Sequence, residues 1–338
     1  MDTLNVALVG CGIFGEIHAG SYAEYERSNL VAVCDIDGSK AKAFGEQFGC
    51  RHTTSVDDIA DDEEIQAVSV ATPDFAHREI CVKLAEAGKH VLVEKPLATT
   101  VADGEAIVAA VEKAGVTCMI DFHNRYNPAF TTLKQRLDAG DFGRPLMAFA
   151  RLSDRIEVAV EWFTWSGRTG PEWFLGSHIA DLICWLFGAH PQRVFAEGRK
   201  DVLAAKGIDC YDAMQIHLSF PEGFATLETS WIVPGSWPSI CDFAFSLQTT
   251  EGRSDVALSN QGIVLSDSKE YATPFIIGKT PIGPESFGFM PLPIRDFVRA
   301  VLEGRPAPVP VQDGLKIVKL IAAAVESAET QQVIEVEC

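Results

Sequence analysis

Residues 6–15, VALVGCGIFG, limit the fold of this chain more than any other stretch. A short apolar run, typical of a strand buried on both faces of a parallel sheet, leads directly into Gly10-x-Gly12-x-x-Gly15. In a dinucleotide-binding turn the first glycine permits the tight turn, the second leaves room for a pyrophosphate, and the third lets helix and strand pack closely. The helix N-terminus that follows favours phosphate binding. The pattern predicts a Rossmann βαβ unit whose cofactor contacts are Gly10, Gly12, Ile13, Phe14 and Gly15.

A second apolar run, LVAVCDID, ends at Asp35, twenty residues after Gly15. An acid at this position accepts hydrogen bonds from the adenosine ribose and disfavours a 2′-phosphate. Asp37 adds a second negative charge nearby. The run therefore predicts NAD rather than NADP, and it argues against the alternative of a glycine-rich turn without a ligand.

The next segments continue to alternate between strand and helix patterns as far as residue 122. Such alternation predicts right-handed crossovers and a doubly wound parallel sheet, whose ligands bind beyond the carboxyl ends of the strands. Two further strand ends, ATPDFAH (71–77) and EKP (94–96), are therefore expected at the same crevice as the glycine turn. They supply the remaining candidate cofactor contacts of this region: Ala71, Thr72, Pro73, His77, Glu94 and Lys95.

Composition excludes several classes of function. The net charge of −19 disfavours binding to nucleic acid, which is itself a polyanion. The nine cysteines form no C-x-x-C pair and several lie in apolar runs, which indicates reduced thiols in a cytoplasmic protein. No set of Cys, His and carboxylates has the spacing of a metal site. The first residues, MDTLNVALVG, do not have the pattern of a signal peptide, and no apolar run approaches the ~20 residues of a membrane span.

These motifs resemble the Gfo/Idh/MocA oxidoreductases, the glucose–fructose oxidoreductase and inositol dehydrogenase family. The resemblance begins with the glycine triplet and His18, and continues through Asp35, ATP at 71–73 with His77, and Glu94-Lys95-Pro96. It extends over most of the chain through NRYNP (124–128), HIADLICWLFG (178–188), the strand pattern at 212–231 and the helical pattern at 297–330.

The resemblance implies a dinucleotide-binding domain over residues 1–122 and a second α/β domain over residues 123–338. The second domain is expected to bind substrate and to contain a mostly antiparallel open sheet that forms a homodimer or homotetramer. The implied activity is NAD-dependent hydride transfer between nicotinamide and a sugar, polyol, inositol or glycoside hydroxyl. Two alternatives stay open: glycoside cleavage that retains NAD, and a non-catalytic NAD sensor.

Two residues are candidates for the chemistry. Lys95 follows a strand end where a nicotinamide would lie, and a cation there would stabilise alkoxide charge on the substrate. His178 titrates near neutral pH and is expected in the first turn of a helix capped by Ser177, where it would transfer a proton. Asp181 follows one turn later and either orients His178 or complements the helix dipole. A salt bridge is the structural alternative for Lys95.

Phe174 departs from the family pattern. The resemblance implies an aspartate four residues before His178, in D-x-G-x-H, where this chain has Phe174-Leu-Gly-Ser-His178. Glu172, Asp154 and Tyr211 are possible replacements. The preceding loop concentrates tryptophans, which bind sugar faces or pack at interfaces. The candidate substrate contacts are Arg125, Trp162, Trp165, Phe174 and His178, and Asn124 is expected on the nicotinamide side.

Overall fold

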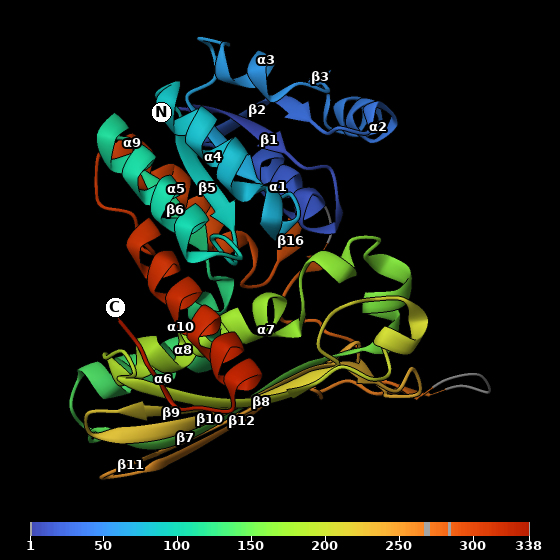
Figure 1. Ribbon diagram of the computed structural model, residues 1–338. Helices are drawn as coiled ribbons and strands as arrows, with labels where there is room; N and C mark the ends of the chain where they lie inside the picture. Colours follow the sequence, from blue (N-terminus) through green and yellow to red (C-terminus); the bar gives the residue numbers. More distant parts are fainter. Residues whose placement is uncertain (1, 267–270, 283–284, 338) are drawn as a thin grey trace. The chain divides into compact units, whose positions relative to one another are not determined.

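A computed structural model describes residues 2–266, 271–282 and 285–337 of the chain (Figure 1). The chain divides into two compact units. Unit 1 contains Met1–His123 and Lys279–Leu315, and unit 2 contains Asn124–Gly278 and Lys316–Cys338. The first division lies one residue from the predicted boundary. The predicted second domain runs without a break over residues 123–338, whereas Lys279–Leu315 belongs to unit 1.

Unit 1 is built on a six-stranded parallel sheet of order β3-β2-β1-β4-β5-β6. Every residue of β4, β6 and nearly all of β1 is buried, as expected for strands covered on both faces. The predicted doubly wound parallel sheet is confirmed. Its strands are β1 (Leu4–Val9), β2 (Ser28–Cys34), β3 (Arg51–Thr53), β4 (Ala67–Val70), β5 (His90–Glu94) and β6 (Cys118–Asp121).

Helices cover both faces of this sheet. The crossover helices are α1 (Ile13–Glu24), α2 (Gly38–Phe48), α3 (Val56–Ala60), α4 (His77–Glu86) and α5 (Val101–Ala114). α4 packs beside α5, whereas α1 packs beside α9 (Pro291–Glu303), which also contacts β5 and β6. Ile294, Phe297 and Val298 of α9 are fully buried. Residues from the C-terminal third thus complete the sheet's cover, which explains why Lys279–Leu315 belongs to unit 1.

Unit 2 is built on a seven-stranded open sheet of order β12-β11-β7-β10-β9-β8-β17. Its neighbouring strands are antiparallel except for the β7–β10 pair, which confirms the predicted mostly antiparallel sheet. The strands are β7 (Pro145–Arg155), β8 (Arg193–Arg199), β9 (Ala213–Phe220), β10 (Gly223–Val233), β11 (Cys241–Thr249), β12 (Arg253–Ala257) and β17 (Ile334–Glu335). Two small ribbons, β13 (Leu265–Ser266) with β14 (Tyr271–Ala272) and β15 (Thr280–Ile282) with β16 (Glu285–Phe287), lie outside both large sheets.

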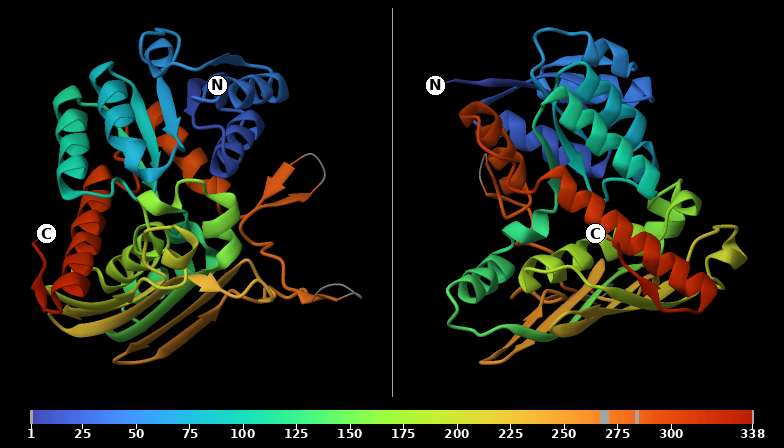
Figure 2. Two further views of the ribbon diagram at one scale, coloured as in Figure 1. Left: turned by 45° about the vertical axis from the view of Figure 1, so that its right-hand side comes forward. Right: turned by 60° about the vertical axis from the view of Figure 1, so that its left-hand side comes forward.

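One face of the unit 2 sheet is covered by helices. α7 (Pro171–Phe174) and α8 (Gly176–Phe187) contact β7, β9 and β10, and α6 (Pro128–Asp138) packs on α8. α10 (Val311–Thr330) is the long helix near the C-terminus. Figure 2 shows the green helices on one face of the sheet, and the described residues place no helix on the other face. Side chains on β10 and β11 accordingly alternate between buried and partly exposed.

The eight cysteines that the structure describes are all free thiols, as predicted, and Cys338 lies outside the described residues. Burial raises the pKa of the Cys118 thiol to about 12, so that it stays protonated. Within the described ranges, no helix combines the length and the apolar character that a membrane crossing requires.

Candidate active site

The glycine turn between β1 and α1 is closely packed at two positions and open at the third. A Cβ at Gly10, whose φ is +104°, would lie 2.4 Å from the carbonyl oxygen of Ala71. A Cβ at Gly15 would lie 2.0 Å from the carbonyl oxygen of Gly10. At Gly12, by contrast, a Cβ would meet no described atom within 4 Å. Gly10 and Gly15 are therefore required by the fold itself, whereas Gly12 leaves open space beside the first turn of α1.

These glycines give a prediction that separates folding from cofactor binding. Gly10→Ala should lower the free energy of unfolding by about 1–3 kcal/mol, because it forces a strained φ and a clash with Ala71. Gly12→Ala is the matched control and should leave unfolding nearly unchanged while weakening NAD binding. Urea unfolding without nucleotide, together with NAD titration, measures both effects. Equal destabilisation by the two substitutions would contradict this division of roles.

Asp35 follows β2 and lies against the glycine turn. Its Oδ2 accepts from the backbone N–H of Cys11 at 2.8 Å, and its Oδ1 accepts from the N–H of Asp37 at 2.9 Å. Both oxygens retain a further lone pair for a ribose hydroxyl. The second predicted acid, Asp37, instead caps α2 by accepting from Ser39, whose hydroxyl and N–H bonds hold the pKa of Asp37 below its usual value. Ile36 between them is 96 % exposed.

The loop after β4 is held in place by hydrogen bonds to other segments of unit 1. The N–H of Ala71 donates to the Val9 carbonyl at 2.8 Å, and His77 is fully buried. The ring nitrogens of His77 lie 2.9 Å from the Pro96 carbonyl and 3.0 Å from the Thr72 carbonyl. Burial lowers the pKa of His77, so the neutral ring donates to one of these carbonyls. The cofactor contact of His77 stays a prediction, and these two bonds show that His77 joins the loops that carry Thr72 and Pro96.

Lys95 lies directly after β5 and is 3 % exposed. Its Nζ lies 5.5 Å from the centre of the Phe14 ring, and the peptide bond to Pro96 is cis. The Phe14 ring in turn stacks on His123, with 6.4 Å between the ring centres. The lysine is thus held beside the first turn of α1, at the carboxyl edge of the parallel sheet where the predicted crevice lies.

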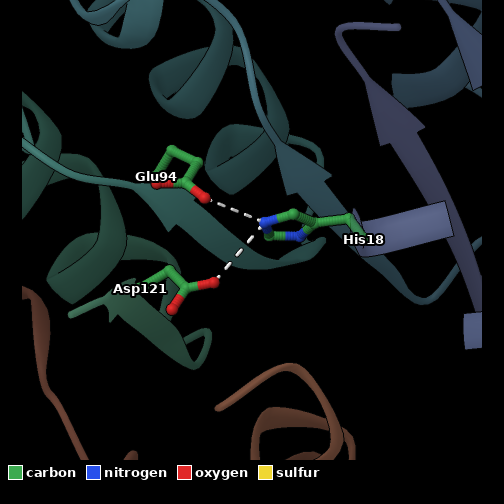
Figure 3. A group of neighbouring side chains, drawn as sticks. All are labelled: His18, Glu94 and Asp121. Atoms are coloured by element: carbon green, nitrogen blue, oxygen red, sulfur yellow. Dashed lines mark hydrogen bonds and ion pairs between the residues drawn. The ribbon is translucent and has the colours of Figure 1, made fainter. Parts of the chain in front are cut away.

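Three side chains from α1, β5 and β6 meet in the interior of unit 1 (Figure 3). His18 Nε2 lies 3.1 Å from Oε1 of Glu94 and 3.4 Å from Oδ2 of Asp121. The other oxygen of Glu94, Oε2, accepts from the Lys95 N–H at 3.2 Å. His18 Nδ1 lies 3.0 Å from the Ser69 hydroxyl. His18, Glu94 and Asp121 are all buried, and we refer to them as the buried triad.

The acids of the buried triad differ in ionisation. Burial, together with the charge of Glu94, raises the pKa of Asp121 well above its usual value. Burial also acts to raise the pKa of Glu94, but the bond from His18 and the nearby charges hold that pKa below its usual value. Burial lowers the pKa of His123 to about 4. The directions of these shifts favour an ionised Glu94, a protonated Asp121 and a neutral His123.

The buried triad also offers three ligand atoms within 4.8 Å of one another, a spacing that could hold a metal ion. The hydrogen bonds account for the same atoms without one. Tyr22 lies 2.6 Å from the Ser69 hydroxyl, so Tyr22 can donate to Ser69 and Ser69 to His18 Nδ1. This direction leaves a proton on Nε2, which donates to Glu94 and has no lone pair for a metal. We therefore assign no metal to the triad.

In unit 2, His178 is the third residue of α8 and is 6 % exposed. Asn124 Nδ2 lies 3.3 Å from His178 Nδ1 and fixes the ring. The expected cap by Ser177 is wrong, because Leu175 is the N-cap and has helical dihedral angles that join α7 almost directly to α8. Ser177 consequently lies inside the helix with a buried hydroxyl. The predicted end of this helix at Gly188, in the left-handed conformation, is confirmed.

Asp181 is paired with Arg125. Nε of Arg125 donates to Oδ2 at 2.9 Å and Nη2 donates to Oδ1 at 2.6 Å, which is a bidentate ion pair. The Asp181 side chain is 1 % exposed and that of Arg125 is 12 % exposed. The sequence predicts that Asp181 orients His178 or complements the helix dipole, and the structure adds this ion pair with Arg125. Arg125, a predicted substrate contact, also holds the 124–128 segment against α8 through this ion pair.

Phe174 belongs to an aromatic cluster of four rings. Its ring centre lies 5.0 Å from that of Phe163, 6.3 Å from that of Trp165 and 5.8 Å from that of Trp231. Phe163 and Trp165 stack at 4.5 Å. Trp231 is fully buried, whereas the other three rings are partly exposed. Trp162, predicted with Trp165 as a substrate contact, is half exposed and forms no ring contact with this cluster among the described residues.

The glycine turn and the parallel sheet have counterparts in known proteins. Residues 4–122 match the oxidoreductase family with an NAD-binding Rossmann fold, and residues 130–254 match the GFO/IDH/MocA C-terminal domain. The chain belongs to the Gfo/Idh/MocA oxidoreductase family. The predicted family is therefore confirmed, and with it an NAD-binding enzyme of the oxidoreductase class.

Relatives match over the full length of this family member. It is 27 % identical over 361 residues to the scyllo-inositol 2-dehydrogenase (NADP(+)) IolW of Bacillus subtilis (strain 168), covering all of this chain and 97 % of the relative. It is 26 % identical over 398 residues to the levoglucosan dehydrogenase of Pseudarthrobacter phenanthrenivorans, covering 99 % of each chain. GenD2 from gentamicin A biosynthesis, solved with NAD, shares the fold with a TM-score of 0.88 at 24 % identity, over 100 % of this chain and 97 % of that one.

The residues at the predicted crevice fit a bound NAD. Gly12 leaves open space at the start of α1, where α1 has no side-chain cap and the backbone N–H groups of its first turn point outward. The Thr72 hydroxyl is buried and has no hydrogen-bond partner among the described residues. Gly12, Ile13, Asp35, Thr72 and Lys95 are thus the residues best arranged to hold the dinucleotide.

Two features of this Gfo/Idh/MocA protein have no signal in its sequence. The buried triad unites residues 18, 94 and 121, and no sequence spacing marks such a set. Trp231, at the end of a strand pattern, gave no sign that it would contact the loop before α8. Glu172, Tyr211 and Asp154 are the candidates to replace the family's aspartate. Glu172 interacts electrostatically with Lys200 and Cys210, and Tyr211 interacts with Lys200. Asp154 lies opposite Cys241 in the register of β7 and β11.

Proposed function

We propose that this chain is an NAD-dependent dehydrogenase that interconverts a ring hydroxyl of a sugar or polyol and the corresponding ketone. The observation that carries the proposal is a buried lysine at the carboxyl edge of a Rossmann sheet, beside the glycine turn. NAD, when bound, supplies the hydride acceptor. The protein must bind and orient the hydroxyl, remove its proton and stabilise the charge that develops on its oxygen.

Lys95 and His178 are proposed to divide these tasks. The ammonium of Lys95 donates a hydrogen bond to the substrate oxygen and stabilises alkoxide charge, which is worth most in a site that excludes water. The imidazole of His178 accepts the hydroxyl proton in oxidation and returns it in reduction. In this proposal unit 1 binds the dinucleotide and unit 2 supplies the substrate pocket.

Asn124 is proposed as the residue that keeps His178 competent in both directions. The carboxamide has one donor and one acceptor, so it can donate to Nδ1 or, after turning over, accept from Nδ1–H. The proton on Nε2 can then be present or absent while Nδ1 stays hydrogen-bonded at a distance such as the observed 3.3 Å. This role differs from the direct nicotinamide contact that the sequence suggested for Asn124.

Phe174 and its cluster favour substrates with an apolar ring face. Three partly exposed rings, Phe163, Trp165 and Phe174, offer π faces to axial C–H groups, as aromatic side chains do at sugar sites. The relatives named above act on scyllo-inositol and levoglucosan, which are compact rings with few freely rotating groups. We therefore place the substrate among cyclitols and cyclic or anhydro sugars.

The proposal is tested by measuring NADH formation with a panel of cyclitols, anhydro sugars, aldoses and aryl glycosides. Turnover with at least one ring polyol and NAD is expected. Cleavage of a glycoside without net NADH would indicate the NAD-retaining reaction instead. Tight NAD binding without turnover on any member of the panel would indicate a sensor, and either result would contradict the proposal.

Asp35 gives a prediction about cofactor choice. Asp35→Ser removes the charge that disfavours a 2′-phosphate and the acceptor that binds the ribose hydroxyls. We expect kcat/KM with NAD to fall about tenfold or more and the preference for NAD over NADP to erode. Steady-state kinetics with both cofactors provide the measurement. Asp37→Ser is the matched control, since Asp37 caps α2, and it should keep the parent's preference.

The bare face of the unit 2 sheet is proposed as an interface between copies of this chain. Met147 and Phe224, neighbours on β7 and β10, are 43 % and 45 % exposed on this face. A homodimer or homotetramer is expected in light scattering, and Phe224→Lys should dissociate it, whereas a monomeric parent would contradict the assignment. We also place the protein in the cytoplasm, which its free thiols support and cell fractionation can test.

A further inference from the structure

Two carboxyl groups of the buried triad lie against the same imidazole nitrogen but have different surroundings (Figure 3). Both oxygens of Glu94 are hydrogen-bonded, Oε1 to His18 and Oε2 to the Lys95 N–H. Asp121 is 2 % exposed, and its Oδ1 has no hydrogen-bond partner among the described residues. A buried ionised carboxylate with an unpartnered oxygen is costly, whereas a carboxyl group that keeps its proton is not. The contacts alone therefore assign the negative charge to Glu94.

Other titratable groups interact electrostatically with the acids of the buried triad. His123 on η2 (His123–Tyr126) is neutral, since burial lowers its pKa to about 4. Burial raises the pKa of Tyr22 on α1, which stays a phenol. His77 interacts electrostatically with Asp74 and lies 2.9 Å from the Pro96 carbonyl. His18 Nε2 lies 3.1 Å from Glu94, and it is the donor of this bond because an ionised carboxylate can only accept.

We propose that Glu94 is a positioning residue for Lys95: its carboxylate, fixed by His18 and by the Lys95 amide, keeps the lysine an ammonium, while Asp121 holds a proton and stays neutral. The proposal rests on the proposed function for its catalytic consequence, but the ionisation of the three groups exists without substrate. Glu94, which precedes Lys95 in the chain, thereby has a defined function. Asp121 on β6 lies against the same histidine nitrogen and serves as an internal comparison.

The pH dependence follows from the sign of the interaction. Lys95 acts as a cation, so activity falls as pH rises and the ammonium loses its proton. Glu94→Gln removes the attraction that favours the cation, so this alkaline loss should move to lower pH by about one unit or more. Asp121→Asn is the matched control, because an amide reproduces a carboxyl group that carries its proton. The acidic limb, governed by His178, should be unchanged in both variants.

Carbon-13 NMR of the full-length protein tests the ionisation directly. In protein labelled in lysine Cε, the Lys95 resonance is assigned by its absence in Lys95→Ala and followed as pH is raised. We expect the titration to move to lower pH in Glu94→Gln and to stay in place in Asp121→Asn. Equal shifts in the two variants, or no shift in Glu94→Gln, would overturn the proposal. These spectra need no turnover, so their outcome is separate from that of the substrate panel.

The parent protein gives a second measurement that no folding defect can obscure. In protein labelled in Asp Cγ and Glu Cδ, Asp121 should show the chemical shift of a protonated carboxyl group at neutral pH, and Glu94 that of a carboxylate. The reverse assignment would overturn the proposal. So would a stoichiometric metal ion found by elemental analysis of the purified protein, because a metal would occupy the position that we assign to the proton of His18.

Discussion

Lys95→Ala is expected to lower kcat/KM for the best ring polyol by about 10²–10³-fold or more, while the protein stays folded. Removing one preorganised donor that stabilises charge on a reacting oxygen typically costs this much. The loss should fall mainly on kcat, because the ammonium interacts most strongly with the alkoxide that forms in the transition state. NADH formation at saturating NAD measures the effect.

Lys42→Ala serves as the control for this experiment. Lys42 is on α2 of the same unit, with a side chain that is 64 % exposed and a surface ion pair to Glu46. Its loss should leave turnover and the thermal midpoint unchanged, since surface pairs contribute little. Lys95→Arg keeps the charge but not the compact geometry of an ammonium, and should recover only a small part of the rate. Parent-like turnover in Lys95→Ala would remove Lys95 from the mechanism.

His178→Asn should lower kcat by about 10²–10⁴-fold, which is the usual contribution of a positioned acid–base group. The acidic limb of the pH–rate profile should disappear with it. In the parent, that limb arises because His178 must be unprotonated to accept the hydroxyl proton, so activity in oxidation falls as pH drops through its pKa. Residual activity in the variant should rise with hydroxide concentration and show no plateau near neutral pH.

The matched control for His178 is His217→Asn. His217 is exposed on β9 and its Nδ1 lies 3.4 Å from the Thr226 hydroxyl, so its imidazole is available to solvent but not to the proposed chemistry. The substitution should keep both kcat and the acidic limb. Retention of that limb in His178→Asn would show that another group transfers the proton.

The sequence predicts those parts of the molecule that depend on short-range rules. Residues 6–15 place an apolar strand, three glycines and a helix in one order, and the backbone approach at Gly10 and Gly15 allows few other residues there. Alternating strand and helix patterns leave a parallel sheet as the simplest arrangement. The doubly wound sheet and the open antiparallel sheet followed from these patterns and from the family resemblance.

Features that depend on contacts between distant segments were not predictable in the same way. α9 follows the unit 2 strands in sequence, yet its apolar face covers β5 and β6 of unit 1. Serine is a residue type that often caps helices, which made Ser177 a candidate. Helical conformation continues from α7 through Leu175, however, so α8 already begins at Gly176. Asp181 forms a charge-assisted pair with Arg125, which is 56 residues away in the chain.

We propose that Lys95 of unit 1 and His178 of unit 2 act on one hydroxyl group of the substrate. A crystal structure of the protein with NADH and the ketone or polyol from the activity panel tests it most directly. We expect the Lys95 Nζ and one ring nitrogen of His178 at about 2.6–3.2 Å from the same substrate oxygen. A complex in which either group lies more than about 10 Å from that oxygen, with the cofactor and the ring fully bound, would contradict it.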